Sequence, residues 1–288
     1  MRDQPVERRP NHRRQGLPRA AAVLAIAVLL FPGMGAQEPR PYRILLTNDD
    51  GIRAPGLLAL IEPLSRLGDV TIVAPAENQS GAGHAVSLSD PIYADEVTLP
   101  GGARAIALTS TPATAVKVAL GRLLAQPPDL VVSGVNRGLN WGLNAYISGT
   151  VAAAREAAMH GVPAIASSLA VEGHPAYSAA AAVTAEVAGI VKSGGLPAGV
   201  FLNVSVPAGS AGKGLRLTRQ SALSGQDRYD EQKTPYGRRY FWNLFSQPTS
   251  DREGTDVWAV SQGYAAVTPL AAREFDAAAF AALQGRFK

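Results

Sequence analysis

Short apolar runs separated by polar turns recur along most of this chain. Each run is four to eight residues long and is apolar at consecutive positions, which is typical of strands buried on both faces of a sheet. Pro75 and Pro207 follow two of the runs and limit their length. We therefore expect buried strands at residues 42–47, 69–74, 129–133, 164–167 and 199–206.

The segments between these runs have helical spacing. Thr111-Pro112 opens one of them with a capping residue and a proline suited to the first helical turn, and Gly161 ends another. The expected helices cover residues 55–67, 111–124, 151–160 and 177–192. Strands that alternate with helices predict an α/β fold with a doubly wound, parallel sheet.

The amino-acid composition of the sequence changes after Pro207. Glycine, serine, arginine and tyrosine become more frequent, and Arg238–Phe245 (RRYFWNLF) has the pattern of a strand or hairpin arm. We interpret residues 41–206 as the core and residues 207–288 as an extension and closing segment, with a C-terminal β-hairpin arm that serves oligomerisation.

Residues 1–36 have the pattern of an export signal. A basic stretch that ends at Arg19 precedes an apolar run at residues 20–31 and then small residues up to Ala36. The run is shorter than the roughly 20 residues of a membrane-spanning helix. We expect a signal peptide and a periplasmic or secreted protein without stable membrane insertion after cleavage. An uncleaved N-terminal anchor, or a misassigned start and a cytoplasmic protein, are the alternatives.

Charge and cysteine content exclude several classes of protein. Six arginines against two acidic residues in residues 1–36 account for the formal net charge of +4, so the rest of the chain is neutral. A nucleic-acid binder would carry a basic body, and we expect no nucleic-acid partner. The chain contains no cysteine, which excludes disulfides, thiolate metal sites and thiol nucleophiles.

The polar residues that follow the first strand are the strongest chemical signal. Asn48, Asp49, Asp50 and Gly51 lie where a parallel sheet binds its ligands, beyond the carboxyl end of a strand. Two adjacent carboxylates at this place suit a shared divalent cation, because hard cations prefer oxygen ligands. A solvated turn that caps the next helix explains the same residues equally well.

Three further segments deliver polar groups to the same sheet edge. Ser80 and Gly81 lie in the loop after the second strand, and Asn136, Arg137 and Asn140 lie in a loop rich in asparagine and glycine after the third. Ser148-Gly149-Thr150 precedes a helix whose free N–H groups and dipole favour an anion. Each segment also fits a loop or a cap, but together they indicate a metal-assisted phosphoryl site.

These segments, in this order, resemble the SurE family of 5′/3′-nucleotidases. The resemblance spans residues 42–270, and the segments that carry it are ILLTNDDGIRAPG (residues 44–56), VAPAENQSG (73–81), TPATAVK (111–117), DLVVSGVNRGLNWG (129–142), SGTVAAARE (148–156) and GTDVWAVSQGYAAVTPL (254–270). It implies a three-layer, Rossmann-like core and a homodimer or homotetramer formed through the C-terminal arm.

The resemblance also implies an activity, a cofactor and site residues. The activity is hydrolysis of nucleoside 5′-monophosphates, and of 3′-monophosphates as a further option, with one Mg²⁺ or Mn²⁺ ion per subunit. The family's metal ligands fall on Asp49, Asp50, Ser80 and Asn136, and the two aspartates are the catalytic candidates. The candidate phosphate or substrate contacts are Asn48, Gly81, Arg137, Asn140, Ser148, Gly149 and Thr150.

Three positions depart from the family pattern. Ile147 stands where the family usually has tyrosine, and Leu143 and Asn144 stand at positions that are commonly acidic. These departures motivate an alternative, an exported nucleotide- or metal-binding module without significant turnover. A dinucleotide-dependent oxidoreductase is disfavoured, because no Gly-x-Gly-x-x-Gly turn follows the first strand.

Overall fold

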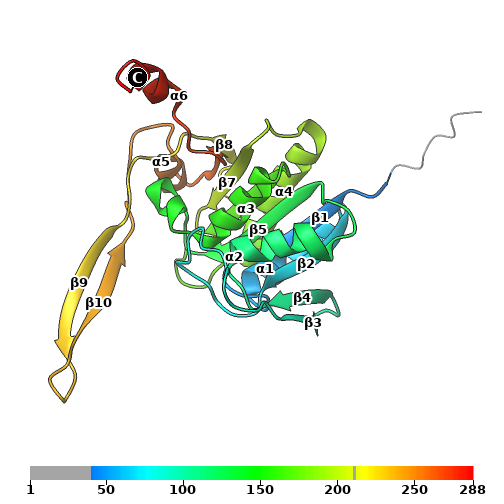
Figure 1. Ribbon diagram of the computed structural model, residues 1–288, viewed down its shortest axis with the longest axis horizontal. Helices are drawn as coiled ribbons and strands as arrows, with labels where there is room; N and C mark the ends of the chain where they lie inside the picture. The colour runs from blue at the N-terminus through cyan, green and yellow to red at the C-terminus, as the bar shows by residue number, and fades with distance from the viewer. Residues whose placement is uncertain (1–39, 210–211, 288) are drawn as a thin grey trace, which may run out of the picture. The chain divides into compact units, whose positions relative to one another are not determined.

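The computed structural model describes residues 40–209 and 212–287. Its centre is a nine-stranded sheet with the order β3-β4-β2-β1-β5-β6-β7-β11-β8 (Figure 1). In this order the strands are β3 (Ala94–Thr98), β4 (Arg104–Leu108), β2 (Asp69–Pro75), β1 (Arg43–Thr47), β5 (Leu130–Arg137), β6 (Ala164–Leu169), β7 (Val200–Val206), β11 (Ala265–Ala271) and β8 (Leu215–Leu217).

The sheet is mostly parallel, as the alternation of strands and helices predicted. The six strands from β4 to β7 run parallel to one another, whereas β3 and β11 run antiparallel to β4 and β7. Strand order reverses between β1 and β5, because the chain first builds outward from β1 to β2 and later adds β5 on the other side. Ligands of open α/β sheets bind at such a switch point.

Helices cover both faces of the sheet and give three layers (Figure 1). On one face, α1 (Pro55–Ser65) and α4 (Tyr177–Gly194) share a hydrophobic core with β1, β2 and β5 that includes Leu57, Leu60 and Val187. On the other, α2 (Pro112–Val118), its π-helical continuation η1 (Ala119–Leu123) and α3 (Gly149–Met159) form a second core. The predicted three-layer fold is confirmed.

The segment after Pro207 divides between the sheet and an arm. β8 and β11 extend the sheet, and α5 (Asp256–Ser261) lies between them in the chain. β9 (Gln226–Lys233) and β10 (Arg239–Ser246) pair only with each other in the described structure, and all their residues are exposed. The predicted hairpin is therefore present, and a short helix α6 (Ala277–Leu283) follows β11.

Two features of the fold differ from the sequence prediction. The antiparallel pair β3–β4 has no counterpart among the expected strands. β3 is mostly exposed and lacks an apolar run, whereas β4 is a short, mostly buried apolar run that the expected strands did not include. β11 and β8 belong to the same sheet as the predicted core, so the core continues beyond residue 206. The predicted signal at residues 1–36 lies outside the described residues. Within the described residues, no helix has the length and apolar character needed to cross a membrane.

Candidate active site

The candidate site lies where β1 and β5 end side by side. Thr47 pairs with Ser133 in the parallel register, so the residues beyond both strands emerge at the same edge. The backbone N–H of Arg137 donates a hydrogen bond to Asp50 Oδ2 at 3.0 Å, which joins the two loops. The structure thus brings together polar segments that are nearly 90 residues apart in the chain.

Asp49 is a buried carboxylate with few partners. Its residue is 2% exposed, and its Oδ1 accepts a hydrogen bond of 2.5 Å from Thr150 Oγ1. In the described part of the chain, no salt bridge reaches it. Its pKa is raised to about 6, mainly by burial and to a lesser extent by the neighbouring Asp50, against the opposing effect of the Thr150 hydrogen bond. A charge held in this way is stabilised by a cation.

Asp50 is less deeply placed than Asp49. Burial raises the pKa of its carboxyl group, while the hydrogen bond from the Arg137 backbone and the Arg137 charge act in the opposite direction. Asn48 holds the turn that carries both aspartates, because its Nδ2 donates to Gly51 O at 2.8 Å.

The loop with Ser80 is fixed to the same turn. The backbone N–H of Gln79 donates to the Asp49 carbonyl at 2.7 Å, and the Ser80 N–H donates to Asn78 Oδ1. Within the described residues no hydrogen bond of the Ser80 hydroxyl is found, so its oxygen is available to a ligand.

A bulge in β5 positions Asn136. Gly134 has φ of +139°, and a Cβ at this position would lie 2.4 Å from Ser167 O on β6, so only glycine fits. The register between β5 and β6 shifts between Ser133 and Asn136. Asn136 Nδ2 then donates to Gly138 O at 2.7 Å and to Asn140 Oδ1 at 3.4 Å, which leaves its Oδ1 as a free carbonyl oxygen.

The N-terminus of α3 forms one wall of the site, where Ser148 lies. Ser148 caps the helix by accepting a hydrogen bond from Val151 N–H at 3.2 Å. Gly149 packs directly on Asp49, and an added methyl group would lie 2.9 Å from Asp49 Cβ and 3.0 Å from its Oδ2. Thr150 is fully buried, and its hydroxyl is donated to Asp49. Thr150 is therefore placed to orient Asp49, and its contact with phosphate stays a prediction.

These segments enclose a cavity of about 180 Å³. Seven of the eleven predicted site residues line it: Asp49, Ser80, Gly81, Asn136, Arg137, Asn140 and Ser148. The other four, Asn48, Asp50, Gly149 and Thr150, surround it without lining it. Asn140 Nδ2 is buried and has no hydrogen-bond partner among the described residues, so it is a donor available to an anion.

Six further residues line the cavity without having been predicted: Gly138, Leu139, Asn144, Ile147, Phe245 and Gln247. The last two come from the base of the hairpin. Gln247 Nε2 donates to Leu139 O at 3.1 Å, and Gln247 Oε1 accepts from Asn144 Nδ2 at 3.3 Å. No local pattern marks Phe245 or Gln247, since only the return of the arm to the sheet brings them to this edge.

A charged cluster outside the cavity anchors the Ser80 loop. His84 Nε2 lies 2.7 Å from Glu156 Oε2, and Lys117 Nζ donates to Glu156 Oε1 at 3.0 Å. Burial alone would raise the pKa of Glu156, but hydrogen bonds and charges from His84 and Lys117 lower it to about 2. His84 does not line the cavity, and its contact with Glu156 gives it a structural place beside the loop.

The residues at the cavity fit a hard divalent cation. Asp49, Ser80 and Asn136 offer a carboxylate, a hydroxyl and an amide oxygen to one space, with Asp50 beside them. Among the described residues, no group of three or more His, Cys, Asp or Glu side chains is arranged so that it could hold a metal ion. The candidate set therefore depends on two carboxylates and two neutral oxygens, a set that suits Mg²⁺ or Mn²⁺ better than Zn²⁺.

The fold and the site define a Rossmann-like α/β protein with an oxygen-rich cavity at its topological switch point. Residues 44–227 match the family described as Survival protein SurE, and the chain belongs to that family. The 5′-nucleotidase SurE of Syntrophobacter fumaroxidans is 43% identical over 231 residues, which cover 79% of this chain and 92% of the relative.

Two further comparisons agree with this assignment. The 5′-nucleotidase SurE of Moorella thermoacetica is 43% identical over 231 residues, covering 79% of this chain and 89% of the relative. The crystal structure of the SurE protein from Aquifex aeolicus superposes with a TM-score of 0.75 at 33% identity, covering 85% of this chain and 100% of that chain. The predicted family membership is confirmed.

Proposed function

We propose that this chain is a 5′-nucleotidase that uses a divalent metal ion to hydrolyse nucleoside monophosphates to nucleoside and phosphate. The observation that carries the proposal is the buried Asp49, which faces a cavity with Ser80, Asn136 and Asn140 but has no cationic partner in the described structure. Membership of a family whose similar relatives are named 5′-nucleotidases supports the same reaction.

The chain's own residues supply the binding and orientation that the reaction needs. Thr150 fixes the Asp49 carboxylate, and the Arg137 backbone fixes Asp50. The Asn140 amide, the Arg137 side chain and the capped start of α3 at Ser148 are suited to phosphate oxygens. An aspartate of the pair Asp49 and Asp50 is the candidate to orient or deprotonate the attacking water.

Asp49, Asp50, Ser80 and Asn136 would hold the metal ion. Such an ion, when bound, neutralises phosphate charge and makes hydroxide available near neutral pH. Mg²⁺ and Mn²⁺ both accept these oxygen ligands.

The test is phosphate release from a panel of nucleoside 5′- and 3′-monophosphates, with Mg²⁺ or Mn²⁺ and with a chelator. Asp49→Asn is the matched control, because it keeps the shape of the side chain and removes its charge. We expect metal-dependent release by the native protein and none by the variant. Metal binding without release from any nucleotide would instead support the binding module that Ile147, Leu143 and Asn144 motivate.

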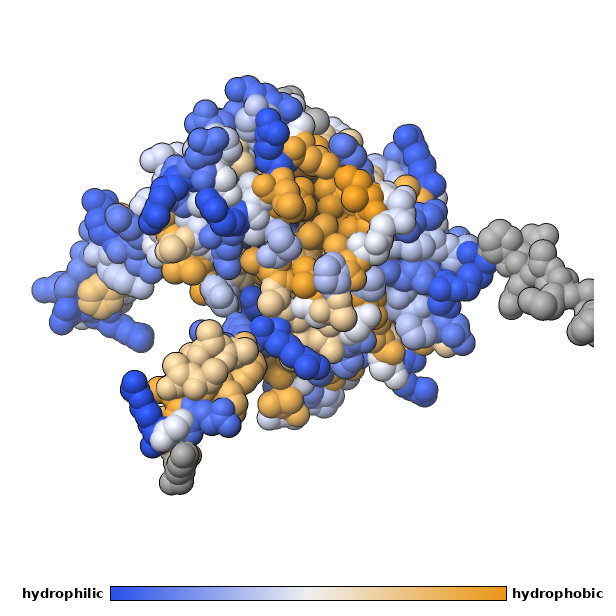
Figure 2. Space-filling model, turned by 90° about the horizontal axis from the view of Figure 1, so that it is seen from above, coloured by the Kyte–Doolittle hydropathy of each residue, from blue (hydrophilic) through white to orange (hydrophobic). Residues whose placement is uncertain are grey.

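We also propose that the hairpin is an oligomerisation arm. β9, β10 and the turn between them expose a set of large apolar side chains: Tyr229, Tyr236, Tyr240, Phe241, Trp242, Leu244 and Phe245. Figure 2 shows, in addition, a broad hydrophobic area bordered by hydrophilic residues on one face of the molecule. Exposed apolar surface of this kind marks interfaces. A dimer or tetramer in light scattering, and a monomer after removal of residues 226–246, are the expected results.

Export through residues 1–36 is the remaining proposal. Its support is the basic, apolar and small-residue pattern of that segment. N-terminal sequencing of protein recovered from the periplasm or medium tests it, and recovery of the intact chain from the cytoplasm alone would contradict it.

A further inference from the structure

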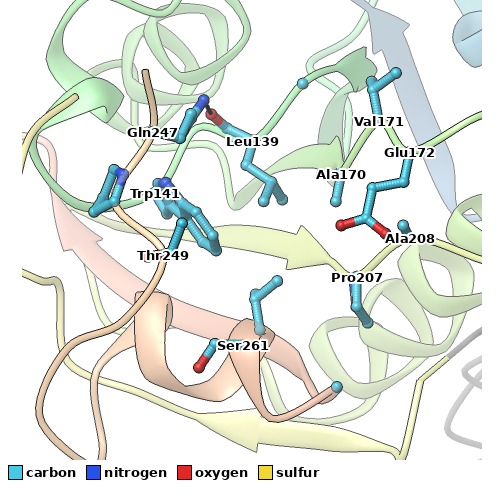
Figure 3. Close-up of a pocket in the computed structure, with 14 residues that line it drawn as sticks. Leu139, Trp141, Ala170, Val171, Glu172, Pro207, Ala208, Gln247, Thr249 and Ser261 are labelled. Carbon is cyan, nitrogen blue, oxygen red and sulfur yellow. Dashed lines mark hydrogen bonds between the residues drawn. The ribbon is translucent and has the colours of Figure 1, made fainter. Parts of the chain in front are cut away.

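A second and larger cavity adjoins the candidate active site. It has a volume of about 630 Å³ and shares Gly138, Leu139 and Gln247 with the smaller cavity. Its walls come from the loops after β5, β6 and β7, the segment after β10, and α5 (Figure 3). A ligand held at Asp49 can therefore extend past Leu139 into this space.

The larger cavity has the chemistry of a site for a neutral organic group. Its apolar walls are Leu139, Trp141, Val171, Pro207, Pro248 and Val260. Cavities of 300–1,000 Å³ with apolar walls and a few polar groups are typical of small-molecule sites.

The charges in this cavity are the reverse of those that suit phosphate. Its lining contains no lysine, arginine or histidine, and its single charged residue is Glu172. In Figure 3 the Glu172 carboxylate is turned toward the cavity, opposite Leu139 and Trp141. An ionised carboxylate only accepts hydrogen bonds, so its natural partners are hydroxyl or amino donors. The ligand that fits both cavities is anionic at one end and, at the other, neutral and partly apolar with hydroxyl or amino donors.

We propose that the larger cavity binds the nucleoside part of the substrate, with Glu172 accepting hydrogen bonds from the ribose hydroxyls and the base lying against Leu139 and Trp141. This inference rests on the proposed phosphomonoesterase function. It makes Glu172 and the cavity walls determinants of substrate choice, separate from the residues that handle phosphate.

Two variants test the inference with substrates that are all phosphate monoesters. Ala208 is half-buried and lines the larger cavity only, so Ala208→Trp fills it. We expect it to lower kcat/KM for AMP at least tenfold and to leave glycerol 2-phosphate, which has no base or ribose, unchanged. Ala198→Trp is the control, because Ala198 is exposed and lines neither cavity.

Glu172→Ala tests the ribose contact. Glu172 is exposed, so we expect the variant to fold as the native protein does. Hydrogen bonds to a charged group correspond to about a tenfold to hundredfold change in equilibrium. We expect kcat/KM to fall by about tenfold for a ribonucleoside 5′-monophosphate and to stay unchanged for its 2′,3′-dideoxy analogue. Equal losses on both substrates, or none, would overturn the assignment.

The two proposals fail in different ways. If the native protein released phosphate from neither AMP nor glycerol 2-phosphate, the proposed function would fail, and adenosine binding by calorimetry would still test the cavity. Binding to the native chain that is lost in Ala208→Trp and kept in Ala198→Trp is the expected result. Activity on both esters that Ala208→Trp and Glu172→Ala leave unchanged would refute the nucleoside site alone.

Discussion

Replacing Thr150 by valine separates an orienting role from a phosphate-binding role. Valine keeps the shape of threonine, but it cannot donate the 2.5 Å hydrogen bond to Asp49 Oδ1. A hydrogen bond to a buried charged group contributes about 1.5–3 kcal/mol to stability. Partners that orient a metal ligand typically contribute about 10–100-fold to metal affinity or activity. We therefore expect the free energy of unfolding to fall by about 1.5–3 kcal/mol and kcat/KM to fall by about 10–100-fold.

The assay is phosphate release from AMP during a Mn²⁺ titration. If Thr150 acts through Asp49, Thr150→Val weakens the apparent affinity for Mn²⁺, and Thr150→Ser restores it because the hydroxyl returns. Thr184→Val is the matched control: Thr184 is equally buried, and its hydroxyl bonds Ser167 and Ala180 O instead. This control loses stability but keeps its Mn²⁺ dependence.

The result that refutes the reasoning is specific. A Thr150→Val variant with unchanged Mn²⁺ affinity and kcat but a raised Michaelis constant would show that Thr150 contacts phosphate, as its position before the helix first indicated. The hydrogen bond to Asp49 would then be without functional consequence.

Three further outcomes are expected. Gly149→Ala forces a methyl group against Asp49 and should destabilise the fold by about 1–3 kcal/mol, measured by urea unfolding, with a parallel loss of phosphate release. The pKa of Glu156 is lowered from 4.5 to about 2, so its stabilisation is complete above pH 4.5 and is lost as the pH falls toward 2. Native protein should lose on the order of 3 kcal/mol over that range relative to Glu156→Gln in acid-unfolding curves. Mn²⁺ at a hundred times its Kd should stabilise the native protein by about 2.7 kcal/mol in thermal unfolding, and Asp49→Asn should show no such rise.

The parallel core of the fold was predictable because its signal is local. Each central strand is an apolar run, and the helices between them have the spacing and caps of amphipathic segments. β3 was missed because Ala94–Thr98 is polar and exposed, so no periodicity distinguishes it from a loop. β4 was missed although its five residues, RAIAL, are a mostly buried apolar run. The antiparallel direction of β11 depends on which edge the returning chain meets, and that is not encoded in its own residues.

The site likewise contains residues that a local sequence pattern predicts and residues that depend on tertiary packing. Asp49, Ser80 and Asn136 follow predicted strands, so the topology alone places them together. The partner of Thr150 was not predictable, because it depends on the close packing of Gly149 against Asp49. Leu139 and Gln247 line both cavities, but their meeting depends on the path of the arm back to the sheet.

The contacts of Gln247 connect the hairpin arm to the candidate active site. A single carboxamide, one residue after β10 ends, binds the backbone of Leu139 and the side chain of Asn144, and it belongs to the walls of both cavities. A neighbouring subunit that bound the hairpin and shifted it would displace Gln247, which lies at the boundary between the two cavities. Subunit assembly would then change the Michaelis constant for the substrate through the cavity walls, without a movement of Asp49 or Asp50.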